Sequence, residues 1–285
     1  MSIWLTYPEV LSNNQMATYA VGDVQGCFYS FQNLLKKINF NSKVDQLWLV
    51  GDIINRGQGS LETLDWCYKN RGNLKIVFGN HDLHFLSVAF NQKKMSSTDT
   101  LQPILASRNL NKYIDWMLSW PLIHKDKNFL MVHAGLMPDW SIDDALDLEK
   151  EVMVSLRKDP NDFFKNMYGN KPDKWSSAYK TKDKQRLAIN AMTRLRCINI
   201  DNAIDFTYKS DLNNIPDSLT PWFDIKAKKT RGEFIISGHW SAIGIQKHNY
   251  GITLDTGCVW GGELSAYCIE SGSLLSVNSD PRDLL

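Results

Sequence analysis

The sequence predicts an α/β fold, and two observations support this prediction. First, runs of β-forming apolar residues alternate with segments whose apolar residues recur at helical spacing, which builds a sheet covered by helices. Second, five of the apolar runs end in a turn that carries a polar side chain suited to metal binding; they span residues 19–21, 47–50, 75–78, 129–132 and 234–237. Because the carboxyl ends of neighbouring strands open onto one crevice in α/β sheets, the five turns predict one shared site.

Helices are expected after each of the first three strands, at residues 28–38, 61–70 and 84–90. The pattern Ser141-x-x-Asp144 is typical of a capping box, so we expect another helix from there to about Lys158. No strand periodicity is clear beyond it, and residues 141–232 are interpreted as an inserted, partly helical lobe over the crevice. Two strands, at residues 252–254 and 263–268, complete the expected order.

Composition favours one enzyme-sized domain and restricts the classes of partner. A chain of 285 residues can bury one substantial core, which we assign to residues 16–285, with residues 1–15 as an N-terminal extension. A formal net charge of +1 gives no general basic field for a nucleic acid or an anionic membrane. The five cysteines form no C-x-x-C pair, and no apolar run is long enough to span a membrane. We therefore expect a cytoplasmic protein.

The side chains in the five turns form a ligand set for two divalent metal ions. Asp23, Gln25 and Asp52 supply oxygen atoms for one ion. Asp52 bridges the two ions. The other ligands of the second ion are Asn80, His133 and His239. Two ions about 3.5 to 4 Å apart bind water, lower its pKa to give a hydroxide and stabilise both oxygens of a displacement at phosphorus. Two divalent ions also outweigh the two carboxylates, which favours an anionic substrate.

Several polar residues near these turns are candidates for catalysis or phosphate binding. A lone histidine is usually a core or turn residue, as we interpret His84, His124 and His248, but His81 lies between Asn80 and Asp82. That position favours His81 as the general acid for the leaving oxygen, with Asn55 and Asp82 as further catalytic candidates. Three arginines suit phosphate contact: Arg56, and also Arg194 and Arg196, which share a face if their segment is extended. A solvated basic face is the alternative for each arginine.

The order of these motifs resembles the calcineurin-like metallophosphoesterases. Four further blocks, at residues 167–176, 190–196, 219–223 and 254–262, resemble the symmetrical bis(5′-nucleosyl)-tetraphosphatase family within them. The resemblance covers nearly everything after Met16. It implies two mixed β-sheets in a sandwich flanked by helices, and two divalent ions, with manganese first and cobalt or magnesium as alternatives. The implied reaction is hydrolysis of diadenosine tetraphosphate to two ADP, without a stable protein partner. Related dinucleoside polyphosphates and nucleoside-capped RNA 5′ ends are further implied substrates.

Two residues depart from the wider phosphatase pattern. Gln25 stands where most relatives have a metal-binding histidine, which predicts weaker binding of the first ion and a preference for harder metals. Asn55 stands where protein phosphatases have an aspartate paired with the catalytic histidine. An amide orients His81 without stabilising an imidazolium by charge, so the role of His81 as an acid stays open. The change suits an acidic leaving group such as ADP.

Two other functions are alternatives to the tetraphosphatase. One is a Ser/Thr-type phosphatase with the same metal core, and the other is a catalytically silent nucleotide-binding module. For the tetraphosphatase, the lobe is expected to hold one ADP half, with Arg194 or Arg196 on its phosphates. Tyr168, Trp175 or Trp222 would lie against the adenine, and the alternative for each aromatic is a place in the core of the lobe.

Overall fold

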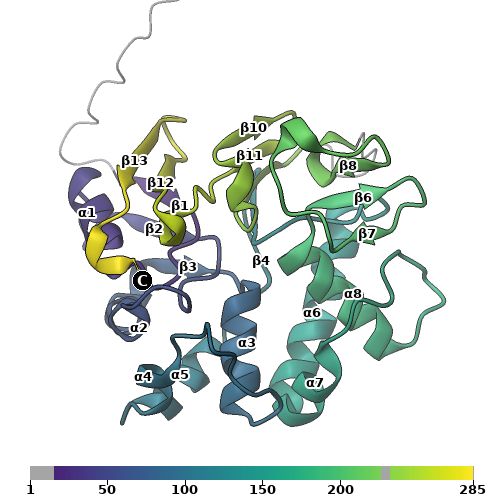
Figure 1. Cartoon of the computed structure of the whole chain (residues 1–285), viewed down its shortest axis with the longest axis horizontal. Coiled ribbons are helices and arrows are strands. Elements are labelled where there is room, and N and C mark those ends of the chain that lie inside the picture. The colour runs from purple at the N-terminus through teal and green to yellow at the C-terminus, as the bar shows by residue number, and fades with distance from the viewer. Residues whose placement is uncertain (1–15, 226–231, 285) are drawn as a thin grey trace, which may run out of the picture.

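The computed structural model describes residues 16–225 and 232–284. Its centre is a pair of five-stranded mixed sheets that face each other (Figure 1). Side chains from both sheets pack between them, including Ala20, Trp48, Met131, Ile236 and Ile252. The strands of Ala20, Trp48, Met131 and Ile236 also present apolar side chains to the flanking helices, as alternation along a strand requires. The predicted α/β fold and the two-sheet sandwich are confirmed.

The first sheet has the strand order β13-β12-β1-β2-β3. Three neighbouring strands in it are parallel: β1 (Thr18–Val21), β2 (Gln46–Leu49) and β3 (Leu74–Ile76). The antiparallel pair β12 (Glu263–Cys268) and β13 (Leu274–Asn278) completes the sheet. The carboxyl ends of β1, β2 and β3 therefore lie at one edge, each followed by one of the predicted ligand turns.

The second sheet has the strand order β10-β11-β9-β5-β4. Its parallel strands are β5 (Phe129–Val132), β9 (Phe234–Ser237) and β11 (Gly251–Thr253). The outer strands β4 (Ile123–Asp126) and β10 (Gln246–His248) are antiparallel to their neighbours. The five predicted motif strands are thus divided between two sheets, and their turns meet where the sheets face each other.

The first three predicted helices are present as α1 (Phe28–Lys37), α2 (Ser60–Lys69) and α3 (Asn80–Ala89). Helix α3 begins four residues before its predicted start because the Asn80 motif is itself the first helical turn. Backbone N–H of Gly79 donates to the Asp82 carboxylate, which closes that turn. The short helices α4 (Gln102–Leu105) and α5 (Leu110–Met117) were not predicted.

The segment between β5 and β9 contains three helices and a small sheet. The helices are α6 (Ile142–Lys158), α7 (Pro160–Met167) and α8 (Thr181–Arg194), and the predicted capping box starts α6. The three-stranded sheet of β6 (Cys197–Asn199), β7 (Ile204–Asp205) and β8 (Leu219–Pro221) corrects the sequence interpretation, which found no strand pattern here. Strands of two or three residues are too short to show alternation.

We call this segment the lobe; it lies to one side of the two large sheets (Figure 1). Its boundaries at residues 141 and 232 stay a prediction, as does the extension at residues 1–15, which lies outside the described residues. Among the described helices, none combines the length and the apolar character needed to cross a membrane.

Candidate metal centre and substrate cavities

The ligand turns of the two sheets pack against each other closely enough to exclude side chains at two glycines. A Cβ atom on Gly79 would lie 2.1 Å from Oδ1 of Asp52, and one on Gly238 would lie 2.0 Å from Oδ1 of Asp23. Backbone N–H of His239 also donates to Asp23 Oδ1, which joins the turn after β9 to the turn after β1. The glycines in these motifs therefore bring the ligand side chains together, beyond shaping the turns.

Three predicted ligands form a compact donor cluster. One donor atom each from Asp52, His133 and His239 lies within 4.8 Å of the other two. Oδ2 of Asp52 is 3.4 Å from Nε2 of His133. Nδ1 of His133 lies 2.8 Å from Val50 O, and a carbonyl only accepts, so Nδ1 carries the ring proton. In the neutral ring, Nε2 is left with a free lone pair for a metal ion.

Buried acceptors without partners support metal binding at this cluster. Within the described chain, Oδ2 of Asp23 and Nε2 of His239 are buried and make no hydrogen bond. The side-chain oxygen of Asn80 faces two further acceptors, Thr193 O at 2.9 Å and Nδ1 of His239 at 3.0 Å. Either rotation of the amide or a cation removes this repulsion. A donor set of carboxylate, amide and imidazole atoms fits a divalent ion of the manganese type.

The electrostatics of the cluster also favour cations. Burial, and then the charge of Asp255, raise the pKa of Asp23 well above its ordinary value. Burial raises the pKa of Asp255 to about 6 and that of Asp82 to about 7. For His133, burial lowers the pKa, but the carboxylates of Asp52 and Asp23 outweigh burial and raise it to about 10. Several buried carboxylates thus compete for one histidine, and divalent ions would relieve their repulsion.

Strained backbone marks the same residues. Gln25, Asp52, Asn55, Arg56 and His239 are not glycines, yet their φ angles are 45°, 49°, 80°, 70° and 70°. Side chains rarely adopt this left-handed region, and such residues concentrate at functional sites. Gln25 lies at the wall of the cavity that contains Asp52 and His239. The structure thus brings the six predicted metal ligands into one region.

Two cavities of about 410 Å³ each lie side by side and share four lining residues. The first, which we call the metal cavity, contains Asp52, His239 and Asp255. The second, the lobe cavity, lies between α3 and the lobe. Their common wall is formed by Arg56, Asn80, His81 and Arg194. Asp52 and His239 of the donor cluster line the metal cavity alone, so the two cavities are neighbours that share these four wall residues.

The three predicted phosphate-binding arginines all line the metal cavity. Arg56 donates to Thr98 O at 3.0 Å, and Arg194 donates to the side-chain oxygens of Asn190 and Asn170. Arg194 ends helix α8, so its segment is not a continuous strand as expected, but Arg196 reaches the same cavity. Nε of Arg196 is buried without a hydrogen-bond partner, which leaves it available for an anion.

The predicted base-binding aromatics lie in different surroundings. Tyr168 lines the lobe cavity and is 40% exposed. Trp175 and Trp222 line neither cavity: Trp222 is buried against Gly135, and Trp175 packs edge-on against Trp140. Trp222 is buried in the core and Trp175 is partly buried against it, which favours the core alternative over adenine contact for both. Trp260, in the metal cavity and 66% exposed, was missed, although it lies in a block that carried the family resemblance.

The predicted catalytic residues differ in their access to the cavities. His81 lines both cavities, and its Nδ1 lies 3.0 Å from Nδ2 of Asn55. Asp82 is fully buried and accepts hydrogen bonds from backbone N–H of Gly79, Asp52 and Ile53. Asp82 therefore positions the turns and does not face the cavities, which corrects the expectation of a direct catalytic role.

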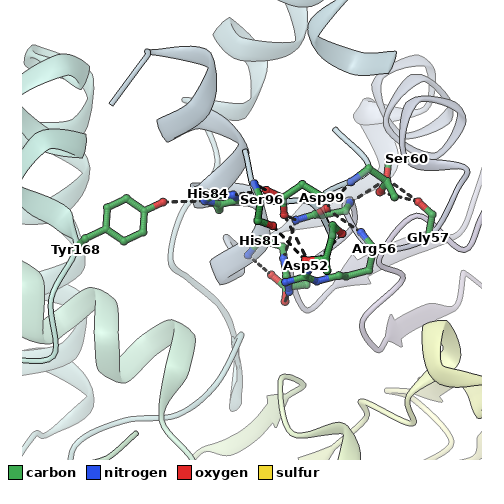
Figure 2. A network of polar contacts seen from close by, with 12 residues as sticks. Asp52, Arg56, Gly57, Ser60, His81, His84, Ser96, Asp99 and Tyr168 are labelled. Carbon is green, nitrogen blue, oxygen red and sulfur yellow. Dashed lines mark hydrogen bonds and ion pairs between the residues drawn. The ribbon is translucent and has the colours of Figure 1, made fainter. Parts of the chain in front are cut away.

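His84, interpreted from the sequence as structural, contributes to the site. It lines the lobe cavity, and its Nε2 lies 3.0 Å from Oδ2 of Asp99 (Figure 2). Sequence reasoning missed Asp99 as well, because it follows no strand and belongs to no motif. Asp255 was also missed, although it follows a predicted strand in the way the proposed ligands do.

Comparisons with known proteins agree with this geometry. The family model for calcineurin-like phosphoesterases matches residues 16–242. A protein of Methylobacillus flagellatus named symmetrical bis(5′-nucleosyl)-tetraphosphatase is 44% identical over 269 residues, which cover 94% of this chain and 97% of the relative. The protein of the same name from Cellvibrio japonicus is also 44% identical, over 91% of this chain and 98% of the relative.

Two solved structures share the fold. A candidate diadenosine tetraphosphatase has a TM-score of 0.63 at 23% identity, covering 95% of this chain and 97% of that chain. A Saccharomyces cerevisiae serine/threonine phosphatase has a TM-score of 0.54 at 15% identity, covering 95% of this chain and 81% of that one. The solved structures show the fold alone, because their identities are below 25%. The family is decided by the relatives at 44% identity, which carry the tetraphosphatase name. The chain is a hydrolase that belongs to the calcineurin-like phosphoesterases and, within them, to the symmetrical bis(5′-nucleosyl)-tetraphosphatase family.

Proposed function

We propose that this enzyme hydrolyses diadenosine 5′,5‴-P1,P4-tetraphosphate symmetrically, to two ADP. The observation that carries the proposal is a donor cluster beside the metal cavity, which shares four lining residues with a second cavity of the same size. Each cavity, at about 410 Å³, falls within the size range of small-molecule sites. A polyphosphate chain can pass the cluster with one nucleoside on each side, as a substrate with two nucleoside ends requires.

The proposed centre holds two divalent ions. Asp23, Gln25 and Asp52 would hold the first, and Asp52, Asn80, His133 and His239 the second. When bound, the ions lower the pKa of water and stabilise negative charge at phosphorus. Manganese is the proposed metal, since oxygen donors outnumber imidazoles in the set; cobalt and magnesium are the alternatives.

The chain's own cations would hold the phosphates in register. Arg56, Arg194 and Arg196 all face the metal cavity, and the unpaired Nε of Arg196 would gain a phosphate oxygen as its acceptor. Lys209 lines the same cavity and continues the positive wall toward Trp260. These contacts would place an inner phosphorus at the cluster and bind one ADP half on this side.

The lobe cavity would receive the other ADP half. Tyr168 offers a ring for the base, and Lys93 and Lys94 line the same cavity as cations. His81 lies in the wall between the cavities, where it can contact the oxygen of the bond that breaks. Since attack must be in line with the leaving group, this arrangement directs one ADP into the lobe cavity as it forms.

The test is product analysis at early times. The purified full chain is incubated with diadenosine tetraphosphate and manganese, and the nucleotides are separated by chromatography. We expect ADP alone. A substantial early yield of AMP with ATP would overturn the symmetrical assignment and leave the metal site standing. The Asp52→Asn variant, purified in the same way, controls for contaminating hydrolases.

Further assays in the same series address the alternatives. A phosphoserine peptide tests the Ser/Thr phosphatase interpretation, which the shared fold alone does not exclude. Nucleoside-tetraphosphate-capped RNA tests the proposed wider substrate range. The silent-module interpretation is not supported, because the relatives are named as enzymes and three of the six proposed metal ligands form one compact donor cluster. The cytoplasmic location and the lack of a stable protein partner stay predictions.

A further inference from the structure

Asp99, in the loop between α3 and α4, has several polar partners beside the metal centre. Its side chain is only 2% exposed. Oδ1 accepts a hydrogen bond from Nδ2 of Asn55 at 3.0 Å, and Oδ2 accepts from backbone N–H of Ser96 at 2.7 Å. Nε2 of His84 also lies 3.0 Å from Oδ2, and Nη1 of Arg56 is 3.9 Å from Oδ1. Figure 2 shows His84, Ser96 and Arg56 around Asp99.

The amide of Asn55 has only one orientation that satisfies its neighbours. Its Oδ1 accepts from backbone N–H of Arg56 at 2.9 Å and of Thr100 at 3.0 Å. Its Nδ2 then directs one hydrogen to Asp99 Oδ1 and the other to Nδ1 of His81, each at 3.0 Å. Asn55 is fully buried, so turning the amide over would leave buried groups unpaired. Asp99 and the two backbone donors thus fix which end of the amide faces His81.

This orientation determines how His81 faces the site. Nδ1 accepts a hydrogen bond from Asn55, so the proton of the neutral ring is on Nε2. Nε2 lies 4.0 Å from Oδ2 of Asp52, on the side of the metal ligands. His81 therefore presents an N–H donor toward the centre, and its geometry depends on Asp99 through Asn55.

The same carboxylate connects His81 to the lobe. A carboxylate only accepts, so Nε2 of His84 donates to Asp99, and Nδ1 of the neutral His84 ring accepts from the hydroxyl of Tyr168 at 2.9 Å. Tyr168 follows helix α7 of the lobe and lines the lobe cavity. The Asp99 network, defined as Tyr168, His84, Asp99, Asn55 and His81, thus runs from the lobe cavity to the metal ligands.

We propose that Asp99 is the positioning residue that fixes Asn55 and, through it, holds His81 as an Nε2–H donor, so that the enzyme selects substrates by leaving group. A fixed neutral donor stabilises an oxyanion that forms readily, such as a nucleoside phosphate or an aryl oxide. It does not supply the proton that an alkoxide of serine needs to leave. The proposal rests on the proposed function only in taking ADP as the natural leaving group.

The test uses esters whose leaving groups differ in acidity. The kcat and KM values of the manganese-loaded enzyme are measured on a series of aryl phosphates and on phosphoserine. The variants are Asp99→Asn and the exchange Asn55→Asp with Asp99→Asn. The matched control is Asp283→Asn, which alters another fully buried carboxylate that accepts three hydrogen bonds, from Tyr29 and Ser30 on helix α1. Asp283 lines neither cavity.

We expect Asp99→Asn to lower kcat on aryl phosphates about 10- to 100-fold, the usual effect of losing a residue that orients an active-site group. We define the slope as the change of log kcat with the pKa of the leaving group. This slope should be steeper for Asp99→Asn than for the parent, and the slope for Asp283→Asn should equal that of the parent. The exchange keeps one carboxylate and one amide in the buried pair, and should raise phosphoserine hydrolysis relative to aryl phosphate hydrolysis.

Equal slopes for the parent, Asp99→Asn and the exchange would overturn the proposal, as would equal kcat losses in Asp99→Asn and Asp283→Asn. If Asp99→Asn does not fold, the exchange variant decides alone: parental phosphoserine-to-aryl selectivity in a folded exchange variant overturns it. The aryl series does not depend on cleavage of diadenosine tetraphosphate. Failure of this inference and failure of the proposed function are therefore distinguishable.

Discussion

The candidate site is built by two regions with different physical character. The turns of the two sheets contribute buried donors, held where glycines leave no room for a Cβ atom and by backbone hydrogen bonds. The lobe contributes partly exposed side chains, such as Arg194 and Tyr168, whose positions depend on other side chains. Buried ligands suit chemistry that needs fixed geometry, and partly exposed groups suit a substrate that must enter and leave. Changes in the turns should therefore alter kcat and metal content, and changes in the lobe should alter KM.

The largest effect is expected for Asp52→Asn in the turns. Asp52 is the proposed bridge, and the ions that it would hold contribute several kcal/mol of charge stabilisation, so activity should fall on the order of a thousandfold or more. Elemental analysis should show less bound metal per chain. Near-normal turnover with two bound ions would show that Asp52 is not the bridge. It would also contradict the assignment of kcat and metal content to the turns.

A smaller effect is expected for Arg196→Ala in the lobe. Its buried, unpaired Nε is proposed to bind phosphate, and a hydrogen bond to a charged group is worth about 1.5 to 3 kcal/mol, or roughly 10- to 100-fold. We expect the loss mainly in KM, with metal content unchanged. Lys182→Ala, which removes a lobe cation that lines neither cavity, is the control and should leave KM unaltered. Loss of bound metal in Arg196→Ala would show that a lobe residue also affects metal binding, and that the two regions do not act separately.

Two aromatic substitutions sharpen the comparison within the lobe. Tyr168→Ala should raise KM for diadenosine tetraphosphate roughly fivefold, since base stacking is worth about 1 kcal/mol at its lower limit and Tyr168 is partly exposed. Trp222→Ala should leave KM unchanged but lower the free energy of unfolding by about 3 to 5 kcal/mol, because its ring fills the space beside Gly135. Denaturant unfolding and steady-state kinetics on both variants check the pair. A raised KM in Trp222→Ala with an unchanged KM in Tyr168→Ala would place the base against Trp222.

The same two regions differ in how far the sequence predicts them. Each ligand turn was predictable because strand, glycine and ligand lie within a few consecutive residues. Asp99 was not, because its partner Asn55 lies 44 residues away and no local pattern marks the pair. Sequence patterns also gave no sign of the left-handed backbone at Asp52 and His239, which depends on packing between the sheets. Burial separates Tyr168 from Trp222, and burial is a tertiary property that residue type does not reveal.

The smallest expected effect concerns Gln25, the proposed ligand of the first ion that supplies a neutral amide oxygen. Gln25→His should tighten binding of the first ion and shift the preference from manganese toward zinc, because imidazole is the softer donor. The φ angle of residue 25 is 45°, in a backbone region that histidine tolerates better than most residues. The fold should therefore persist in this variant. Metal titration of the metal-free protein, followed by calorimetry with each ion, measures both affinity and preference. Gln25→Ala is the matched control and should weaken the first ion alone. Unchanged affinity and preference in both variants would remove Gln25 from the ligand set and leave the first ion to Asp23 and Asp52.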